Sequence, residues 1–297
     1  MVFFGQTYSD FRLIISDDCS KDRTIEILKE YEKKDKRIKV FYQEKNLGYI
    51  KNFEFLLSQV QNEIYALSDQ DDIWMPDKIE TAVNILRKDN ADLYFSDLYL
   101  INEEGKNISN SFWKEKGFYK KIKKDKKKKG LLLNNYVTGC TIVSKKKFIQ
   151  DIIPIPSGIM HDYWIAIVIS LKGKIVCDEN PHIKYRQHGD NQVGYKMKSK
   201  ELSSLDEIRN MFIDVKLKHF GVLTKTKDIF NEKYKKQNEK ALKYYTKLNK
   251  TKYINFRYWF LYFELYKYEN FKYRIANFII LNIPILGRII YRVKKGN

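Results

Sequence analysis

Short apolar runs alternate with amphipathic segments through the first two hundred residues of the chain. The apolar runs predict buried strands over residues 12–16, 38–42, 64–68, 92–101, 137–144, 175–177 and 183–186. Between several of them, apolar positions recur every three or four residues, which predicts helices over residues 24–31, 49–60, 76–87 and 162–171. Repeated strand–helix units imply an α/β fold whose mostly parallel sheet is covered by helices on both faces.

The pattern changes near residue 200, where we place a domain boundary. Residues 1–200 form the predicted α/β domain, whereas residues 201–297 carry helical patterns in which lysines alternate with tyrosines. Apolar residues gather near the end, but the longest run, 275–286, is too short and interrupted for a membrane-spanning helix of about 20 residues. A helix lying in a membrane interface, which we favour, and a helix pair packed on the first domain both explain this composition.

Composition adds a strong positive charge, with 56 Lys and Arg against 37 Asp and Glu. Such a chain favours anionic partners such as nucleotides, diphosphates or anionic lipids, although a general richness in lysine would give the same charge. Ten lysines lie in residues 114–129, which predict either a solvated loop or a basic flap beside a diphosphate or a membrane. Three isolated cysteines, without a C-x-x-C pair, indicate a reducing, cytoplasmic compartment.

Three carboxylates follow the predicted strand at residues 64–68, in the sequence Asp69-Gln70-Asp71-Asp72. Carboxylates this close repel one another unless a cation lies among them. Mg²⁺ and Mn²⁺ take such oxygen ligands and complete their shells with phosphate oxygens, so the cluster predicts a site for a metal and a diphosphate. An acidic loop that only caps the next helix is the alternative, and for Asp77 that role suffices.

A second acidic pair, Asp17 and Asp18, closes the predicted strand at residues 12–16 and precedes a helix that Ser20 or Asp22 can cap. Ligands of parallel α/β sheets bind at the carboxyl ends of the strands, where both acidic clusters fall. A carboxylate there can accept hydrogen bonds from a nucleotide base or a ribose. Acidic helix caps are common, so this pair alone is a weak signal.

Together with later motifs, the two clusters make the chain similar to the family 2 glycosyltransferases, which have the GT-A fold. The matching residues follow the order of the family and span residues 5–195. They are Gln6-Thr7-Tyr8, Asp17-Asp18-x-Ser20-x-Asp22-x-Thr24, Asn46-Leu47-Gly48 with Asn52, Asp69-x-Asp71-Asp72 with Trp74-x-Pro76-Asp77, Thr138-Gly139-Cys140, His161-Asp162-Tyr163-Trp164 and Tyr185-Arg186-Gln187-His188-x-x-Asn191. The stretches around His161 and His188 resemble those of bacterial rhamnosyltransferases.

The resemblance implies a role for each matching position. It implies that Asp18 contacts the base of the nucleotide, that Asp69 lies near the ribose, and that phosphates are contacted by Lys51 and Arg186. It implies that Asp71 holds a divalent cation, Mg²⁺ or Mn²⁺. It also implies that His188 belongs to a segment that closes over the diphosphate and reaches the metal. The role of Asp72 stays open.

Asp162 matches the catalytic base of the family. The residue also suits this role on its own, because a carboxylate at the start of an apolar helix, partly shielded from water, can be tuned as a general base. It would take the proton from an acceptor hydroxyl as that oxygen attacks the anomeric carbon, which gives transfer with inversion. An Asp that caps the helix and pairs with His161 is the structural alternative.

The resemblance therefore implies an inverting, metal-assisted glycosyltransferase that uses a nucleotide-diphosphate sugar donor. Its acceptor would be a saccharide or a polyprenyl-linked sugar in cell-surface polysaccharide biosynthesis. We expect the protein in the cytoplasm or at the cytoplasmic face of the inner membrane. A nucleic-acid partner is not expected, because nothing resembles a nucleic-acid module and two acidic strand ends would repel phosphates without a metal.

The chain departs from the family at its start. Family members have an apolar strand upstream of the Gln-Thr-Tyr motif, but here that motif begins at Gln6. We therefore expect an amino-terminally truncated sequence whose sheet lacks an interior strand, exposes two strand edges and leaves a slot in its core. The alternative function is then a catalytically impaired remnant that binds at most a nucleotide or a partner.

Overall fold

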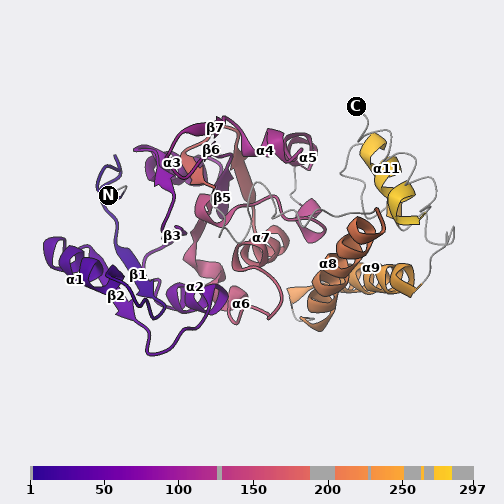
Figure 1. Cartoon of the computed structure of the whole chain (residues 1–297), viewed down its shortest axis with the longest axis horizontal. Helices are drawn as coiled ribbons and strands as arrows, with labels where there is room; N and C mark the ends of the chain where they lie inside the picture. Colours follow the sequence, from indigo (N-terminus) through magenta and orange to yellow (C-terminus); the bar gives the residue numbers. More distant parts are fainter. Residues whose placement is uncertain are drawn as a thin grey trace. The chain divides into compact units, whose positions relative to one another are not determined.

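Figure 1 shows the computed structural model of the chain, which describes residues 3–125, 129–187, 205–226, 229–250, 262–263 and 271–282. The chain divides into two compact units. The first lies within Met1–Phe112, Val137–Ile155 and Met160–Arg186, and the second within Trp113–Tyr136, Pro156–Ile159 and Gln187–Asn297. The domain boundary near residue 200 stays a prediction, because two short segments of the predicted α/β domain group with the helical region.

The described strands all belong to the first unit. They are β1 (Leu13–Asp17), β2 (Ile38–Tyr42), β3 (Ile64–Ala66), β4 (Ile73–Trp74), β5 (Leu93–Ser96), β6 (Tyr99–Ile101), β7 (Asn107–Ser109), β8 (Val143–Lys145), β9 (Ile175–Asp178) and β10 (Ile183–Arg186). They form three sheets with the orders β1-β2, β4-β10-β6-β7 and β3-β8-β5-β9. The predicted α/β class is confirmed.

Strand directions are more mixed than the expected mostly parallel sheet. Three pairs are parallel, namely β1 with β2, β5 with β9 and β6 with β10. β8, by contrast, runs antiparallel to both of its neighbours, β3 and β5. A buried apolar run in the sequence predicts a strand but not its direction, so the pattern alone could not give this arrangement.

Four helices of the first unit follow the predicted positions closely, namely α1 (Thr24–Lys34), α2 (Tyr49–Ser58), α3 (Lys78–Lys88) and α7 (His161–Lys172). The short helix α6 (Ile149–Ile152) was not predicted. α7 is apolar on nearly every side, and its residues from Trp164 to Ile169 are all buried. The indole Nε1 of Trp164 donates to the carbonyl of Ile152 at 2.8 Å, which fixes α7 against α6. Asp162 therefore starts a rigidly held helix.

The strand predicted over residues 92–101 is broken into β5 and β6, which belong to different sheets. Asp97 lies at the break and is buried. Its Oδ1 accepts a hydrogen bond from the amide of Leu98 at 2.8 Å, and the hydroxyl of Ser111 donates to its Oδ2. A side chain that bonds its own backbone competes with the strand ladder, and periodicity does not reveal such a break.

A cavity of about 330 Å³ separates β1 from β3. Leu13 and Ile14 of β1 line it, as do Ile64 and Ala66 of β3. Among the described strands, β1 pairs only with β2 and β3 pairs only with β8, so each has one edge without a strand partner. This cavity forms a slot between β1, which ends just before Asp18, and β3, which leads toward Asp69.

Three longer helices make up most of the described part of the second unit, namely α8 (Leu205–Lys225), α9 (Glu232–Lys250) and α11 (Phe271–Asn282). The guanidinium of Arg209 on α8 donates to the carbonyls of Leu248 and Leu281 at 3.0 and 2.9 Å, which ties the three helices together. No helix among the described residues combines the length and the apolar character needed to cross a bilayer. The apolar run at 275–286 is described only as far as Asn282.

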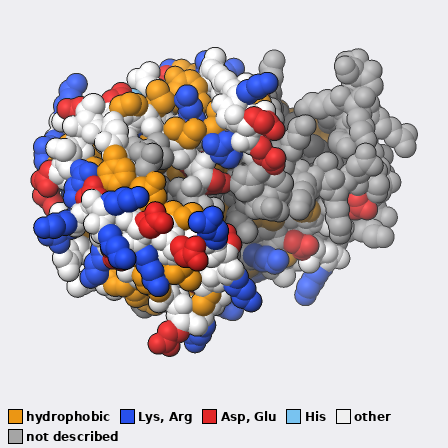
Figure 2. Space-filling model, turned by 60° about the vertical axis from the view of Figure 1, so that its left-hand side comes forward, with side chains coloured by type: hydrophobic (Ala, Val, Ile, Leu, Met, Phe, Trp, Pro, Cys, Tyr) orange, Lys and Arg blue, Asp and Glu red, His pale blue; other side chains and the backbone are white. Residues whose placement is uncertain are grey.

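The lysine-rich segment is more ordered than a solvated loop. It contains the short helices α4 (Phe112–Glu115) and α5 (Tyr119–Lys124) and the 3₁₀ helix η1 (Lys129–Leu132). The buried carboxylate of Asp125 accepts hydrogen bonds from the amide of Gly130 at 2.5 Å and from the hydroxyl of Tyr136 at 2.7 Å. On the face drawn in Figure 2, the Lys and Arg side chains that are described lie interspersed with acidic and apolar ones.

We expect Gly173→Ala to destabilise the fold. A Cβ atom at Gly173 would lie 2.7 Å from Oδ2 of Asp92 and 2.8 Å from Cζ of Phe148. The Asp92 carboxylate cannot easily yield, because the Lys147 ammonium and the Lys174 amide hold it at 2.7 and 2.9 Å. Overpacking of this kind lowers the free energy of unfolding by about 1–3 kcal/mol, which urea denaturation measures.

Gly221→Ala is the matched control. Nothing lies within 4 Å of a Cβ atom at Gly221 in α8, so alanine should raise the free energy of unfolding by about 0.5–1 kcal/mol. Equal stability of the two variants would contradict the packing described at Gly173.

Candidate active site

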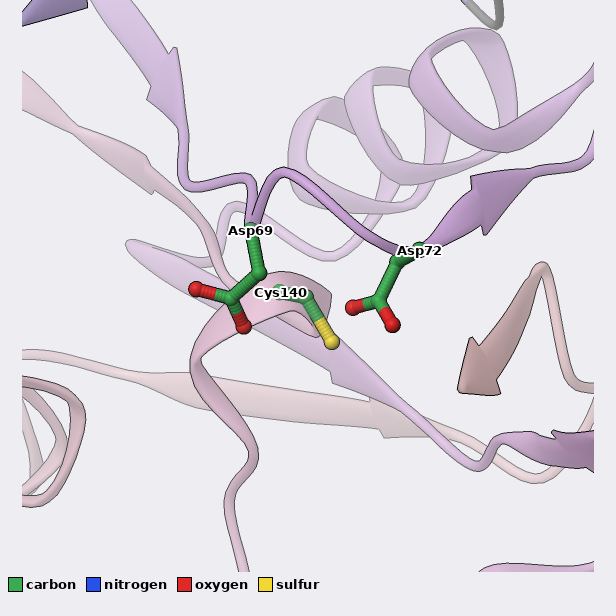
Figure 3. A group of neighbouring side chains, drawn as sticks. All are labelled: Asp69, Asp72 and Cys140. Atoms are coloured by element: carbon green, nitrogen blue, oxygen red, sulfur yellow. The ribbon is translucent and has the colours of Figure 1, made fainter. Parts of the chain in front are cut away.

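The acidic loop between β3 and β4 places two carboxylates close to a thiol. One oxygen each from Asp69 and Asp72 and the sulfur of Cys140 all lie within 4.8 Å of one another. Figure 3 shows these three side chains converging, the two Asp from the loop and Cys140 from the 3₁₀ helix η2 (Gly139–Thr141). Oδ2 of Asp72 is buried and has no hydrogen-bond partner among the described residues.

Burial disfavours the ionised forms of the acids in this cluster. It raises the pKa of Asp69 to about 6 and that of Asp72 to about 7, and the charge of Asp71 adds to both shifts. Burial likewise raises the pKa of the Cys140 thiol well above its usual value. Ordinary carboxyl groups titrate near pH 4, so Asp69 and Asp72 keep their protons to a higher pH than free carboxyl groups do.

Lys78 places a buried side-chain amine close to the cluster. The side chain is buried at the start of α3, its ammonium lies over the indole ring of Trp74, and it has no hydrogen-bond partner among the described residues. Burial lowers the pKa of Lys78 well below its usual value, although the charges of Cys140, Asp72 and Asp69 oppose this shift. The sequence signal for Lys78 was only its place directly after the Trp-x-Pro-Asp motif.

Asp162 lies at the other end of the Thr-Gly-Cys segment. Its carboxylate is buried in the first turn of α7, where Oδ2 accepts a hydrogen bond from the amide of Gly139 at 3.1 Å and Oδ1 accepts one from the amide of Tyr163 at 2.5 Å. Gly139 thus contacts Asp162 while the next residue, Cys140, contacts the acidic cluster. The structure brings these two predicted sites together through adjacent residues.

Asp18 is tied to the loop that opens α2. Its two carboxylate oxygens accept hydrogen bonds from the amides of Leu47 and Gly48 at 2.6 and 2.9 Å. Gly48 has a φ angle of +76°, which a residue with a side chain adopts only with strain. Each carboxylate oxygen has two lone pairs, so Asp18 can hold this loop and still accept a bond from a ligand.

The two predicted phosphate contacts, Lys51 and Arg186, differ in the partners that their side chains bind. Lys51 is half exposed on α2 and forms an ion pair with Glu54 at 2.7 Å. Arg186, at the end of β10, holds the acidic loop through its Nε, which donates to the carbonyl of Asp71 at 3.1 Å, and through its amide, which donates to Oδ1 of Asp72. Its Nη1 donates to the carbonyl of Glu103 at 2.5 Å. Arg186 therefore positions the loop.

The two residues predicted as metal ligands are Asp71 and His188. Asp71 is half buried in the acidic loop but does not belong to the group of ligand atoms that lie within 4.8 Å. His188 lies outside the described residues. Cys140 was recognised only as part of the Thr-Gly-Cys motif, because an isolated cysteine gives no signal of a neighbouring carboxylate.

His182 also acquires partners that the sequence did not reveal. Its ring nitrogens lie 3.2 Å from Oδ1 of Asp77 and 3.3 Å from Oδ2 of Asp178. The hydrogen bond with Asp178 raises the pKa of His182. This bridge links the start of α3 to β9, so Asp77 has a structural role beside its place at the helix start.

Comparison with known proteins identifies the family. Residues 3–151 match the family described as glycosyl transferase family 2. The chain belongs to this family. The matching region contains Asp18, Lys51 and the acidic loop, and it ends before Asp162. This glycosyltransferase is 31% identical over 218 residues to the dTDP-rhamnosyl transferase RfbG of Shigella flexneri, a match that covers 65% of this chain and 70% of that protein. The predicted similarity to rhamnosyltransferases is confirmed.

Solved structures confirm the GT-A fold of this glycosyltransferase. TarS 1-349 of S. aureus, in complex with UDP-GlcNAc, superposes with a TM-score of 0.54 at 17% identity, covering 82% of this chain and 66% of that one. The mannosyltransferase PcManGT of Pyrobaculum calidifontis, in complex with GDP-Man and Mn²⁺, gives a TM-score of 0.51 at 14% identity, covering 83% and 67%. At these identities the likeness concerns the fold.

Without metal, the protein should lose stability as the pH rises from 6.5 to 8. The folded-state pKa of Asp72, about 7, lies above its unfolded value near 3.9, so the folded state keeps the proton longer and its advantage is lost as the pH passes 7. For Asp72 alone the loss is about 1 kcal/mol over this range. Urea denaturation in EDTA measures it, and Asp72→Asn should reduce the slope by this amount.

The stability that protonated His182 contributes is also lost as the pH rises. The test is therefore the difference in slope between wild type and Asp72→Asn. Asp151→Asn, which removes a partly exposed carboxylate paired with Lys172, should leave the slope unchanged. An Asp72→Asn slope equal to that of the wild type would contradict the protonated state of Asp72.

Proposed function

We propose that this glycosyltransferase transfers a sugar with inversion from a nucleotide-diphosphate donor, with Asp162 as the general base. The observation that carries the proposal is the link between Asp162 and the acidic cluster through Gly139 and Cys140. A base and a diphosphate site must lie on opposite sides of one anomeric carbon, and two adjacent residues hold these candidates at a fixed separation. The GT-A fold and the family support the same reaction class.

Asp162 would accept the proton of the acceptor hydroxyl while the hydroxyl oxygen forms its bond to the anomeric carbon. The bond from that carbon to the diphosphate oxygen breaks on the opposite face, and the nucleoside diphosphate leaves with the bonding electron pair. The hydrogen bond from Gly139 keeps Oδ2 of Asp162 oriented, and burial keeps bulk water away from the carboxylate.

The acidic loop fits a divalent cation. Asp71 would hold it together with Asp69 and Asp72. The raised pKa values of Asp69 and Asp72, and the unpaired Oδ2 of Asp72, indicate carboxylates that lack a positive partner. His188 is the further proposed ligand. When bound, Mg²⁺ or Mn²⁺ neutralises the leaving diphosphate as a Lewis acid. PcManGT binds Mn²⁺ together with its donor, which supports this assignment by analogy.

The donor would lie along the carboxyl ends of β1 and β3. Asp18 is the proposed contact to the base and Asp69 the contact near the ribose. Lys51 would exchange Glu54 for a phosphate oxygen, since the Lys51 side chain is half exposed and a solvated ion pair of this kind is weak. Arg186 would act on the phosphates through the loop that it holds and through its own charge.

We propose a saccharide or a polyprenyl-linked sugar as the acceptor, in cell-surface polysaccharide biosynthesis. The chain would work in the cytoplasm at the inner face of the membrane, with residues 1–200 as the catalytic domain and residues 201–297 as the basic region that contacts anionic lipid. Three free cysteines and the charge of +19 support this placement.

Asp162→Asn tests the base. The variant keeps the shape of the side chain but loses its proton affinity, so the turnover number should fall about 100-fold or more while the affinity for the donor changes less than about threefold. Release of nucleoside diphosphate measures turnover, and isothermal titration measures donor affinity. Asp151→Asn should retain full turnover, and an Asp162→Asn protein that did the same would refute the assignment.

Asp71→Ala tests the metal site. A panel of UDP, dTDP and GDP, each with Mn²⁺, should raise the melting temperature of the wild type by a few degrees, about what ligand at 100 times its dissociation constant gives. Asp71→Ala should abolish the part of this shift that needs Mn²⁺. Asp77→Ala, at an exposed carboxylate outside the cluster, should preserve it. Wild-type protein that no nucleotide stabilises would favour the impaired remnant instead.

A further inference from the structure

His161 is a buried imidazole without a hydrogen bond. The side chain is only 6% exposed, and neither Nδ1 nor Nε2 has a partner among the described residues. The ring stacks on Phe53 of α2, with centroids 4.0 Å apart and planes at 11°, and Tyr49 lies edge-on to it at 6.1 Å.

The other described histidines do not share this condition. Nε2 of His219 lies 2.8 Å from the carbonyl of Leu132, and both nitrogens of His182 contact carboxylates. A buried polar atom left unpaired costs free energy, and most such atoms in folded proteins have partners. Sites that sacrifice stability in this way are commonly functional, since a ligand can supply the missing bonds.

The position of His161 points to the reacting groups. It precedes Asp162 in the first turn of α7, and a Cβ atom at Gly139 would lie 3.3 Å from its Nε2 and 3.7 Å from Oδ2 of Asp162. The imidazole nitrogen and the carboxylate oxygen therefore face the same glycine. Glycine at this position permits both side chains to approach the backbone closely.

We propose that His161 binds the acceptor, with a ring nitrogen that hydrogen-bonds a hydroxyl of the acceptor sugar beside the hydroxyl that gives its proton to Asp162. The inference rests on the proposed role of Asp162 as the base. Tyr49 is 40% exposed, so its side chain can turn toward solvent and open a path to the imidazole. The rings of Phe53 and Tyr49 then form the apolar wall of the acceptor site.

A neutral imidazole suits this task. It offers one donor and one acceptor, which is what a sugar hydroxyl needs from its neighbour. Burial lowers the pKa of His161 to about 4, so the ring stays neutral at physiological pH and does not compete with Asp162 for its charge.

His161→Phe separates a binding role from a packing role. Phenylalanine keeps the stack on Phe53 but removes both unpaired nitrogens, so the melting temperature should rise by about 2 °C or more. Transfer to the acceptor should fall at least tenfold, whereas hydrolysis of the donor by water, which needs no acceptor sugar, should stay within twofold. His161→Gln, whose amide can donate and accept, should recover part of the transfer and guards against a folding defect in the first variant.

His219→Phe is the control for stability. It removes the partner of the Leu132 carbonyl, so its melting temperature should fall where that of His161→Phe rises. The probes are dTDP-rhamnose, UDP-glucose, UDP-GlcNAc and GDP-mannose as donors, with octyl glycosides of glucose, galactose and GlcNAc as acceptors. The pair that the wild type uses best serves for all variants.

The outcomes distinguish this inference from the proposed function. Undiminished transfer by His161→Phe, with active wild type, overturns the role of His161 alone. A wild type that hydrolyses donor but transfers to none of the glycosides overturns the acceptor assignment. A wild type that neither hydrolyses nor transfers, with every donor, overturns the proposed function and this inference with it.

Discussion

The proximity of Asp69, which is partly buried, and Asp72, which is buried, is the constraint to which the surrounding structure responds. Two carboxylates at such a place repel one another, and the protein offsets this in several ways. The pKa values of both acids are raised, the amine of Lys78 is buried nearby, and the amide of Arg186 donates to Asp72. These contacts do not fully offset the cost of burying the carboxylates, because one oxygen of Asp72 has no partner among the described residues.

The Thr-Gly-Cys segment links the acidic cluster to the rest of the candidate site. Its 3₁₀ turn presents the Cys140 thiol to the acidic cluster and the Gly139 amide to Asp162, so a shift of the turn would move both. Burial of α7 and the bond from Trp164 to Ile152 fix the other end. Asp162 and the cluster are thus linked by one hydrogen bond to Gly139 and by the approach of the next residue, Cys140, to Asp69 and Asp72.

Sequence reasoning predicted most elements of the first unit and the family, because long apolar periods and ordered motifs are local signals. It singled out Asp18, Asp69 and Asp162 as candidates because each lies near the end of a predicted strand or the start of a predicted helix. It could not predict the break at Asp97, because a side chain that bonds its own backbone gives no periodic signal. The antiparallel course of β8 and the burial of Lys78 were not predictable either, since each depends on residues far apart in the chain. The burial of His161 without a hydrogen-bond partner also depends on residues far apart in the chain. The approach of Phe53 and Gly139 buries the ring, and neither is near it in sequence.

The slot between β1 and β3 has a consequence for the cooperativity of the first unit. No backbone ladder joins these two described strands, so the segment with Asp18 and the segment with Asp69 can open and close as separate folding units in amide hydrogen exchange. A nucleotide held by both carboxylates would join them. Protection of the β1 and β2 amides would then depend on occupancy by the donor, and the substrate itself would serve as a structural element of the sheet region.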